Sequence, residues 1–294
     1  METKVKNNVI LVPTDFTEAA ECAISHAVSL AGRTEDKVML LHVINKDTRA
    51  ALKKEGLTED SLREKLSALA NGVRGQGIMA DFILQEGSIF STIGDVAESI
   101  GARLVVIGTH GVVGVQHLIG SYVLKVASTS PVPVVIVQKK KASPEGYNKI
   151  VLPVDEMAEN KQLAVQAMNI AKMFKAEVHI FKAVSNDQFI NNRINLNVGY
   201  AKKLIEAEGL TCIETAYDSK GPGFGKQLNK YAAGIGAGLI MVMNERGMNL
   251  SEYIIGPESE KIINNDGQIA VMCLNPIDGL FIYQSVLSKY GKEY

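Results

Sequence analysis

The sequence lacks several features that would each point to a class of protein. Its 294 residues include no tryptophan and only three cysteines, Cys22, Cys212 and Cys273. The cysteines are odd in number, lie far apart, and form no CxxC pair and no metal-ligand spacing. A disulfide framework and a metal site are therefore not expected, and we predict reduced thiols in or near the core.

An excess of charge of one sign and long apolar runs are missing as well. Lysine and arginine number 31 against 32 aspartate and glutamate, a net charge of −1 that gives no indication of nucleic-acid binding. The run of basic residues at 139–141 is typical of a solvated linker. No apolar stretch reaches the ~18–20 residues that a membrane span needs, and the first residues lack the apolar region of a signal peptide. We expect a cytoplasmic protein with no nucleic-acid or membrane partner.

What the chain does contain is a repeat of about 140 residues. The segment 7–32 is echoed by 147–174, with Asp15 aligned with Asp155. Three further pairs recur in the same order: GARLVVIG (101–108) and GAGLIMVM (236–243), Gly111/Gly120 and Gly247/Gly256, and VPVVIV (132–137) and QIAVMC (268–273). The repeat predicts two homologous domains, 1–140 and 147–276, separated by a polar linker and followed by an extension, 277–294.

Short apolar runs and helical patterns alternate within each domain. The predicted strands of the first domain are 9–12, 37–43, 79–85, 103–108 and 132–137. Those of the second are 149–154, 177–183, 210–217, 238–243 and 268–274. Helical patterns lie between them, at 47–72, 88–102 and 120–129 among others, and Gly32 is the expected stop of the first helix. This alternation predicts an α/β protein with two doubly wound, Rossmann-like sheets of five parallel strands.

Candidate ligand-binding residues fall at the carboxyl ends of the strands, where open parallel sheets bind ligands. In the first domain Asp15 follows the first strand and Val43 ends the second. Gly108 and Gly111 leave the fourth strand, and Gly120 with Ser121 opens the following helix. Glycines let a phosphate approach the backbone, and the N–H groups of a helix start attract an anion. A carboxylate at Asp15 can accept hydrogen bonds from a nucleoside.

Each of these residues also has a purely structural interpretation. Gly108 and Gly111 can simply turn the chain, and Asp15 can cap a helix or form a turn. His110 is typical of a surface loop, and Tyr122 can serve in packing as well as in ligand contact. The remaining histidines show no metal-ligand pattern and are expected to be structural or exposed: His26, His42, His117 and His179.

Standard catalytic and phosphate-binding motifs are absent or incomplete. GPGFGKQ (221–227) resembles a P-loop, but Lys220 replaces its first glycine and Gln227 replaces the residue that would bind magnesium. No GxSxG or HExxH motif occurs. We therefore predict no catalytic residue and no metal ligand, and do not expect an enzyme.

Three stretches together resemble the universal stress protein family in its tandem form. They are ILVPTDFTEAAECAISHAVSLA (10–31), LLHV (40–43) and IGTHGVVGVQHLIGSYVLKVASTSPVPVVIV (107–137). The resemblance covers 7–138 strongly and 147–275 more weakly. It implies adenine nucleotide α-hydrolase-like sheets of order 3-2-1-4-5, paired through their last strands into a pseudo-symmetric unit that dimerises further. Some members bind ATP or AMP, others bind no nucleotide, and most have no established reaction but act in stress tolerance and regulation.

The resemblance also assigns roles to residues. Asp15 matches the aspartate near adenine and ribose, and Val43 matches the position whose backbone meets the base. Gly108 and the loop through His110 match the phosphate end, which Tyr122 adjoins. The motif Gly-x2-Gly-x9-Gly-Ser/Thr falls on the residues Gly108, Gly111, Gly120 and Ser121.

The chain departs from this motif in both domains. Eight residues instead of nine separate Gly111 from Gly120, which we expect to weaken ATP binding more than AMP binding. In the second domain Met243 replaces the first glycine and Pro257 replaces the hydroxyl residue, so we expect a structural or regulatory role there. Three hypotheses follow: a nucleotide-binding stress regulator, a nucleotide-free dimerisation or interaction module, and, least supported, a weak ATPase.

Overall fold

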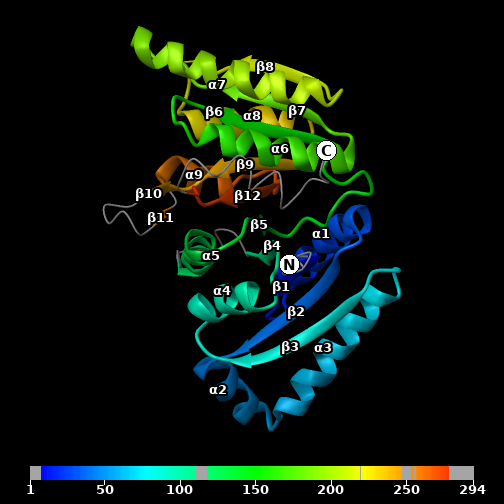
Figure 1. Ribbon diagram of the computed structural model, residues 1–294. Helices are drawn as coiled ribbons and strands as arrows, with labels where there is room; N and C mark the ends of the chain where they lie inside the picture. The colour runs from blue at the N-terminus through cyan, green and yellow to red at the C-terminus, as the bar shows by residue number, and fades with distance from the viewer. Residues whose placement is uncertain (1–7, 110–117, 219, 247–252, 255, 278–294) are drawn as a thin grey trace, which may run out of the picture. The chain divides into compact units, whose positions relative to one another are not determined.

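The computed structural model describes residues 8–109, 118–218, 220–246, 253–254 and 256–277 (Figure 1). The chain divides into two compact units, unit 1 (Met1–Ala142) and unit 2 (Ser143–Tyr294). Each unit is built around five parallel strands and is described by itself.

Unit 1 has the sheet order β3-β2-β1-β4-β5, with every neighbouring pair parallel. The order 3-2-1-4-5 is therefore confirmed. Its strands are β1 (Val9–Pro13), β2 (Lys37–Ile44), β3 (Ala80–Glu86), β4 (Leu104–Gly108) and β5 (Val134–Val137). Its helices are α1 (Glu18–Thr34), α2 (Lys46–Glu55), α3 (Glu59–Arg74), α4 (Ile89–Ser99) and α5 (Leu118–Thr129).

The core of unit 1 lies along its central strands. Residues 10–12 of β1 and 134–137 of β5 are buried without alternation. Helices cover both faces of such a sheet, so its strands have no solvent-facing side and are apolar at successive positions.

Helix α1 is held at both ends by local contacts. The Thr17 side chain caps its first turn by accepting from the Ala20 N–H at 3.4 Å. The prediction that Gly32 ends this helix is wrong, because the helix continues to Thr34 and ends at Glu35 in the left-handed region (φ 58°). The chain after β5 returns to this helix: the His26 ring bonds the Lys140 carbonyl at 3.0 Å.

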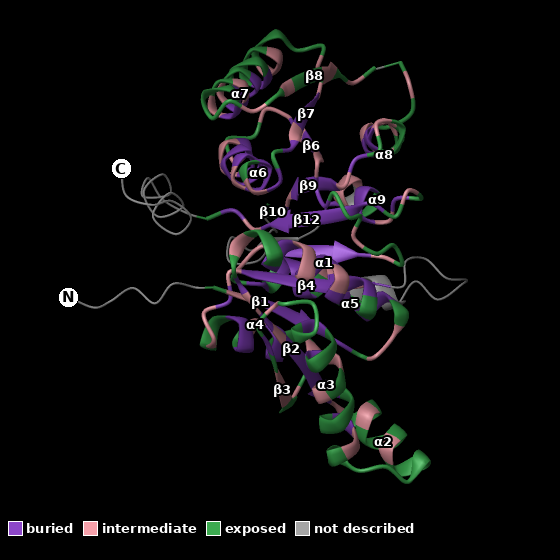
Figure 2. Cartoon of the chain, turned by 90° about the vertical axis from the view of Figure 1, so that its right-hand side faces the viewer, coloured by how far each residue is buried: buried purple, intermediate pink, exposed green. Residues whose placement is uncertain are grey.

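The helical segment predicted over 47–72 is two helices. Gly56 ends α2 with a positive φ of 65°, and α3 begins at Glu59. Helix α2 buries no residue (Figure 2). Helix α3 packs on β2 and β3 through one apolar face, made of Leu62, Leu66, Ala70 and Val73.

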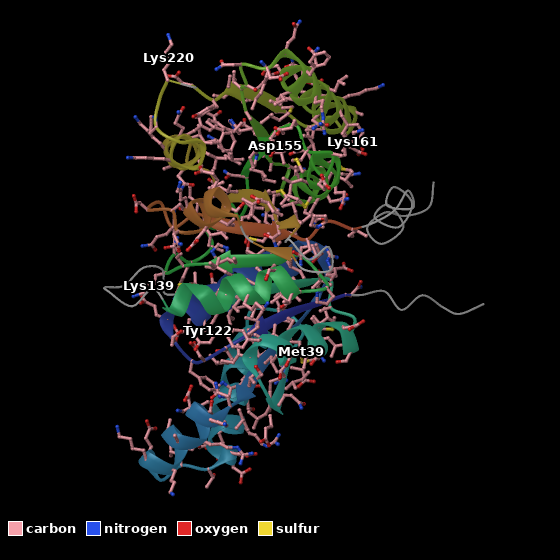
Figure 3. All side chains as sticks on the ribbon, turned by 90° about the vertical axis from the view of Figure 1, so that its left-hand side faces the viewer. Met39, Tyr122, Lys139, Asp155, Lys161 and Lys220 are labelled. Carbon is pink, nitrogen blue, oxygen red and sulfur yellow. The ribbon has the colours of Figure 1, made fainter. Side chains whose placement is uncertain are left out.

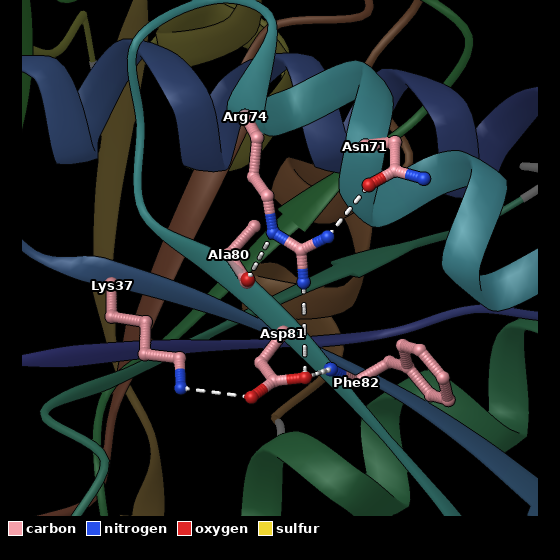
Figure 4. A network of polar contacts seen from close by, with 6 residues as sticks. All are labelled: Lys37, Asn71, Arg74, Ala80, Asp81 and Phe82. Carbon is pink, nitrogen blue, oxygen red and sulfur yellow. Dashed lines mark hydrogen bonds and ion pairs between the residues drawn. The ribbon is translucent and has the colours of Figure 1, made fainter.

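Polar contacts tie the end of α3 to the sheet (Figure 4). Arg74 donates to the Asn71 side chain at 2.6 Å and to the Ala80 carbonyl at 2.9 Å. Its guanidinium and the Lys37 ammonium both approach the Asp81 carboxylate, at 4.0 and 3.2 Å. Arg74 and Asp81 are solvent-exposed and Lys37 is half-buried, so these contacts fix geometry more than they stabilise the fold.

Unit 2 repeats the architecture, with parallel order β8-β7-β6-β9-β12. Its strands are β6 (Lys149–Val154), β7 (Glu177–Lys182), β8 (Cys212–Ala216), β9 (Leu239–Met243) and β12 (Ala270–Leu274). Its helices are α6 (Asn160–Phe174), α7 (Gln188–Ala207), α8 (Phe224–Gly234) and α9 (Pro257–Ile263). A small antiparallel pair, β10 (Glu245–Arg246) and β11 (Tyr253–Ile254), was not expected from the sequence.

Candidate functional site

The candidate site of unit 1 lies at the carboxyl ends of β1, β2 and β4. The order β2-β1-β4 makes these strands neighbours, so Asp15, Val43 and Gly108 are brought to one edge of the sheet. Gly120 and Ser121 lie in the first turn of α5, which begins two residues earlier than predicted. His110, Gly111 and the side chain of Ser121 lie outside the described residues.

Asp15 has a local structural role. Its Oδ1 accepts hydrogen bonds from the N–H of Thr17 at 3.1 Å and from the Thr17 hydroxyl at 2.6 Å. This arrangement is an Asx-turn, which orients Thr17 as the cap of α1. The carboxylate is solvent-exposed, two residues beyond the end of β1.

His42 anchors this turn, a role that the sequence did not indicate. The ring Nδ1 lies 2.7 Å from the Thr14 carbonyl, and the ring centroid lies 4.7 Å from that of Phe16. Because a carbonyl can only accept, Nδ1 carries the proton and donates it. Burial lowers the pKa of His42, which keeps the ring neutral. His42 therefore fixes the backbone of Thr14, the residue that precedes Asp15.

Phe16 takes an unusual backbone conformation between Asp15 and α1. Its φ is 64°, in the left-handed region, and its N–H donates to the Thr14 hydroxyl at 3.1 Å. The Lys65 ammonium of α3 lies 5.7 Å from the centre of the Phe16 ring. A non-glycine residue in this region needs support from its surroundings, here the Thr14 hydroxyl and the two side chains against its ring.

The backbone N–H and carbonyl groups of Val43 face the position just beyond the end of β1. The Thr14 N–H donates to the Leu41 carbonyl at 2.8 Å, and the Ile44 carbonyl accepts from Gly87 of the β3 side at 3.1 Å. Residues of a central parallel strand bond alternately to the two neighbours. The N–H and carbonyl of Val43 therefore point to the β1 side, past Thr14. The Thr48 hydroxyl is 3.4 Å from this carbonyl, a long hydrogen bond.

Gly108 is glycine because of a close contact with α1. A Cβ at this position would lie 2.3 Å from the Ala19 carbonyl oxygen and 2.4 Å from its carbon. Neither a phosphate nor a turn is needed to explain this glycine. The sequence could not reveal the contact, because it joins residues 89 positions apart.

Tyr122 is an exposed residue of α5 that contacts the neighbouring helix α4. Its ring stacks on that of Phe90 in α4, with centroids 5.0 Å apart and an interplanar angle of 20°. The corresponding helices of unit 2 are joined differently, by a hydrogen bond from the Gly225 N–H to the Glu258 carboxylate at 2.7 Å. The position of Tyr122 therefore joins neighbouring helices in both units, which supports the packing interpretation.

In unit 2 the loop after the first strand is closed by the chain's own amides. Asp155 accepts from the Met157 N–H at 2.8 Å and from the Asn160 side chain. Asn197 of α7 donates to the carbonyls of both Asp155 and Met157, each at 2.9 Å. Both asparagines are buried, and Asp155 is labelled in Figure 3. The polar groups of this loop are therefore satisfied from within unit 2.

The glycine that corresponds to Gly120 is also covered in unit 2. A Cβ on Gly256 would lie 1.9 Å from Oε1 of Glu245, so this carboxylate sits against the glycine. The next residue, Pro257, begins α9 and has no N–H to offer. A negative side chain thus lies where an anionic ligand would have to approach.

Metal and membrane features are not found in the described part of the chain. No group of three His, Cys, Asp or Glu side chains there is arranged to hold a metal ion. None of the helices described is long and apolar enough to cross a membrane.

The three cysteines are free thiols, Cys22 and Cys273 buried and Cys212 partly so. Burial raises the pKa of Cys212 to about 11, so it is an unreactive thiol.

Comparison with known proteins gives consistent matches. Residues 6–138 match the model of the universal stress protein family. Universal stress protein MJ0577 of Methanocaldococcus jannaschii is 29% identical over 157 residues, covering 45% of this chain and 96% of the relative. Universal stress protein MJ0531 of the same organism is 27% identical over 140 residues, covering 45% and 82%.

A solved structure matches nearly the whole chain. The crystal structure of a universal stress protein from Archaeoglobus fulgidus covers 93% of this chain and 100% of its own, with a TM-score of 0.74 and 19% sequence identity. At this identity the match establishes a shared fold, and it includes unit 2 as well as unit 1.

Proposed function

We propose that unit 1, whose residues 6–138 match the universal stress protein family, binds an adenine nucleotide as a regulator in the stress response. Binding, rather than catalysis, is the proposed activity. The expected setting is the cytoplasm, with the two halves pairing within the chain and the chain forming a homo-oligomer. Unit 2 is proposed to be structural or regulatory.

The observation that carries this proposal is the backbone edge of Val43 beside Asp15. From the bonds of Leu41 and Ile44 to opposite neighbours, we infer that the N–H and carbonyl of Val43 point past the end of β1. Adenine presents an acceptor nitrogen next to an amino donor, which is the complement of one N–H and one carbonyl. The exposed Asp15 carboxylate follows the neighbouring strand, where it can accept from ribose hydroxyls. Base and sugar are thus recognised from adjacent strand ends.

The first turn of α5 is the proposed phosphate end. Helix α5 runs from Leu118 to Thr129, so the N–H of Gly120 is among the first four, which have no acceptor within the helix. Such groups, together with the helix dipole, favour an anion. The short spacing between Gly111 and Gly120 favours one phosphate over three, so AMP is the preferred ligand.

Titration calorimetry with AMP and ATP tests the proposal. We expect wild-type chain to bind AMP, and Asp15→Asn to weaken it by about ten- to a hundred-fold, the worth of a charged hydrogen bond. Asparagine keeps the acceptor that the Asx-turn uses, so the fold is spared. Gly120→Val is expected to weaken binding through the phosphate end.

The matched control is Asp155→Asn, at the same position of unit 2. It should leave AMP affinity unchanged. Absence of heat from both nucleotides, or an equal effect of the two asparagine variants, contradicts the proposal.

A length change tests the assignment of the phosphate end. Inserting one glycine between Gly111 and Gly120 restores the nine-residue spacing and is expected to raise ATP affinity relative to AMP. The ratio of the two dissociation constants is the measurement, with a glycine inserted in the linker at 143–146 as the control. An unchanged ratio would remove this loop from the site.

A second candidate function is a nucleotide-free dimerisation or interaction module. The closed loop of unit 2 favours it, because Asn160 and Asn197 satisfy Asp155 without any ligand. Under this alternative Asp15 serves only the start of α1. Purified protein that carries no nucleotide but loses partner capture when its pairing strands are altered would select it. A weak ATPase is the least supported function, and steady ATP turnover abolished by Asp15→Ala would revive it.

A further inference from the structure

Helix α7 of unit 2 carries an exposed apolar stripe. Phe189 is 83% exposed and Leu196 is 73% exposed, the highest values for large apolar side chains in the described part of the chain. Seven residues are close to two helical turns, so both side chains lie on one face. Figure 2 shows the outward side of α7 as largely exposed. We call Phe189 and Leu196 the α7 stripe.

The α7 stripe is separate from the face that packs on the sheet. The buried side chains of α7 are Ile194, Asn197, Val198, Ala201 and Ile205. A helix on the surface of a sheet normally has one apolar face and a polar opposite side. A second apolar stripe, exposed to this degree, is typical of a surface that another segment covers.

The described chain ends beside the helix that neighbours α7. Ile277 donates its N–H to Oε1 of Gln162 at 3.0 Å, and its carbonyl accepts from Nε2 of Gln162 at 3.2 Å. Gln162 is on α6, which packs against α7. The adjacent Lys161, which is labelled in Figure 3, has its ammonium 5.8 Å from the centre of the Tyr200 ring on α7. The chain therefore enters its last segment on the α6 and α7 side of unit 2.

The segment that follows is apolar enough and long enough to reach the stripe. Residues 278–294 read DGLFIYQSVLSKYGKEY, with apolar runs at 280–283 and 286–287. Extended, these residues reach at most ~55 Å, whereas the whole of α7 is about 30 Å long. Glycine at 279 permits a change of direction immediately after the anchor at Ile277.

We propose that residues 278–294 pack their apolar side chains on the α7 stripe of the same chain, and not on that of a second copy of the protein. The anchor at Gln162 keeps the segment near α7, and such tethering gives an effective concentration of the order of millimolar. The function of the segment is then to complete unit 2, and this inference does not rest on nucleotide binding.

Photo-crosslinking in the full chain tests the proposal. Phe189 is replaced by benzoylphenylalanine, the chain is irradiated at low micromolar concentration, and the linked peptides are identified by mass spectrometry. We expect a link within one chain to residues 278–294. The control places the same group at Met79 of unit 1, 64% exposed, and should give no link to this segment. A link between two chains, or no link from Phe189, overturns the proposal.

A double-mutant cycle gives a second readout. Phe189→Ser with Leu196→Ser is made in the full chain and in a chain ending at Ile277. We expect the substitutions to lower the melting temperature of the full chain by about 3 °C or more and to leave the truncated chain unchanged. Equal effects in the two chains would mean that the segment does not touch the stripe.

Discussion

Replacing Gly108 with alanine is expected to unfold unit 1 or destabilise it by about 3 kcal/mol or more. The added Cβ would lie 2.3 Å from the carbonyl oxygen of Ala19, and a backbone atom in a helix cannot rotate away as a side chain can. Relief requires α1 to shift away from β4. Urea unfolding of the full chain, together with hydrogen exchange of unit 1 peptides, measures the loss.

Gly72→Ala is the matched control. Gly72 lies inside α3, and apart from its chain neighbours and the backbone of its own helix no atom comes within 4 Å of the Cβ it would gain. Alanine there is expected to stabilise the helix by up to about 1 kcal/mol. Equal stability of the Gly108 and Gly72 variants would show that α1 does not pack against β4 in this way.

The close approach of Gly108 to Ala19 explains this glycine without a ligand. Gly108 is required by the fold, so its presence does not count as support for a phosphate site. Substitutions at Gly108 also cannot test nucleotide binding, because they would remove the fold with the function. The binding tests rest instead on Asp15 and Gly120.

Acidification from pH 6.5 to pH 4 is expected to remove about 3 kcal/mol of stability through His26 alone. The ring is buried on α1 and donates to the Lys140 carbonyl at 3.0 Å. Burial lowers the pKa of His26 from 6.5 to about 4. The unfolded chain therefore takes up a proton below pH 6.5 that the folded chain refuses until about pH 4, so stability falls as the pH falls through this window.

The control is His26→Gln, which can still donate to the Lys140 carbonyl but does not titrate. The free energy of unfolding should then depend less on pH, with the difference from wild type growing between pH 6.5 and pH 4. Burial also lowers the pKa of His42 and His179, which act in the same direction. Asp36 acts in the opposite direction. Burial raises its pKa above the ordinary 3.8, so its contribution makes the fold less stable as the pH rises above 3.8. If the free energy of unfolding depended on pH equally in wild type and in His26→Gln, the assignment to His26 would be contradicted.

The sequence allowed the central strands to be predicted because both of their faces are covered, whereas the edge strands β3 and β8 are largely exposed. Buried parallel strands are continuous apolar runs, and these are visible without a structure. The strand order came from the family resemblance and is confirmed. Helix limits were less predictable: Gly56 ends α2 in the left-handed region, while Gly32 stays inside α1. Glycine ends one helix and not the other, because the packing around each glycine determines where its helix ends.

The candidate site was predictable only where it depends on local sequence. Asp15 after the first strand and Val43 at the end of the second could be placed from local sequence, and the strand order implied by the family resemblance makes these strands neighbours. Contacts between distant segments could not be predicted. Asn197 closes the Asp155 loop from 42 positions away, and no local pattern around either residue announces that contact.

Native mass spectrometry of the purified full chain counts bound nucleotides per chain, and so shows whether unit 1 alone binds an adenine nucleotide. We expect one adenine nucleotide per chain in the presence of AMP, a smaller bound fraction in Asp15→Asn, and the wild-type bound fraction in Asp155→Asn. No bound nucleotide, or two per chain, would contradict this expectation.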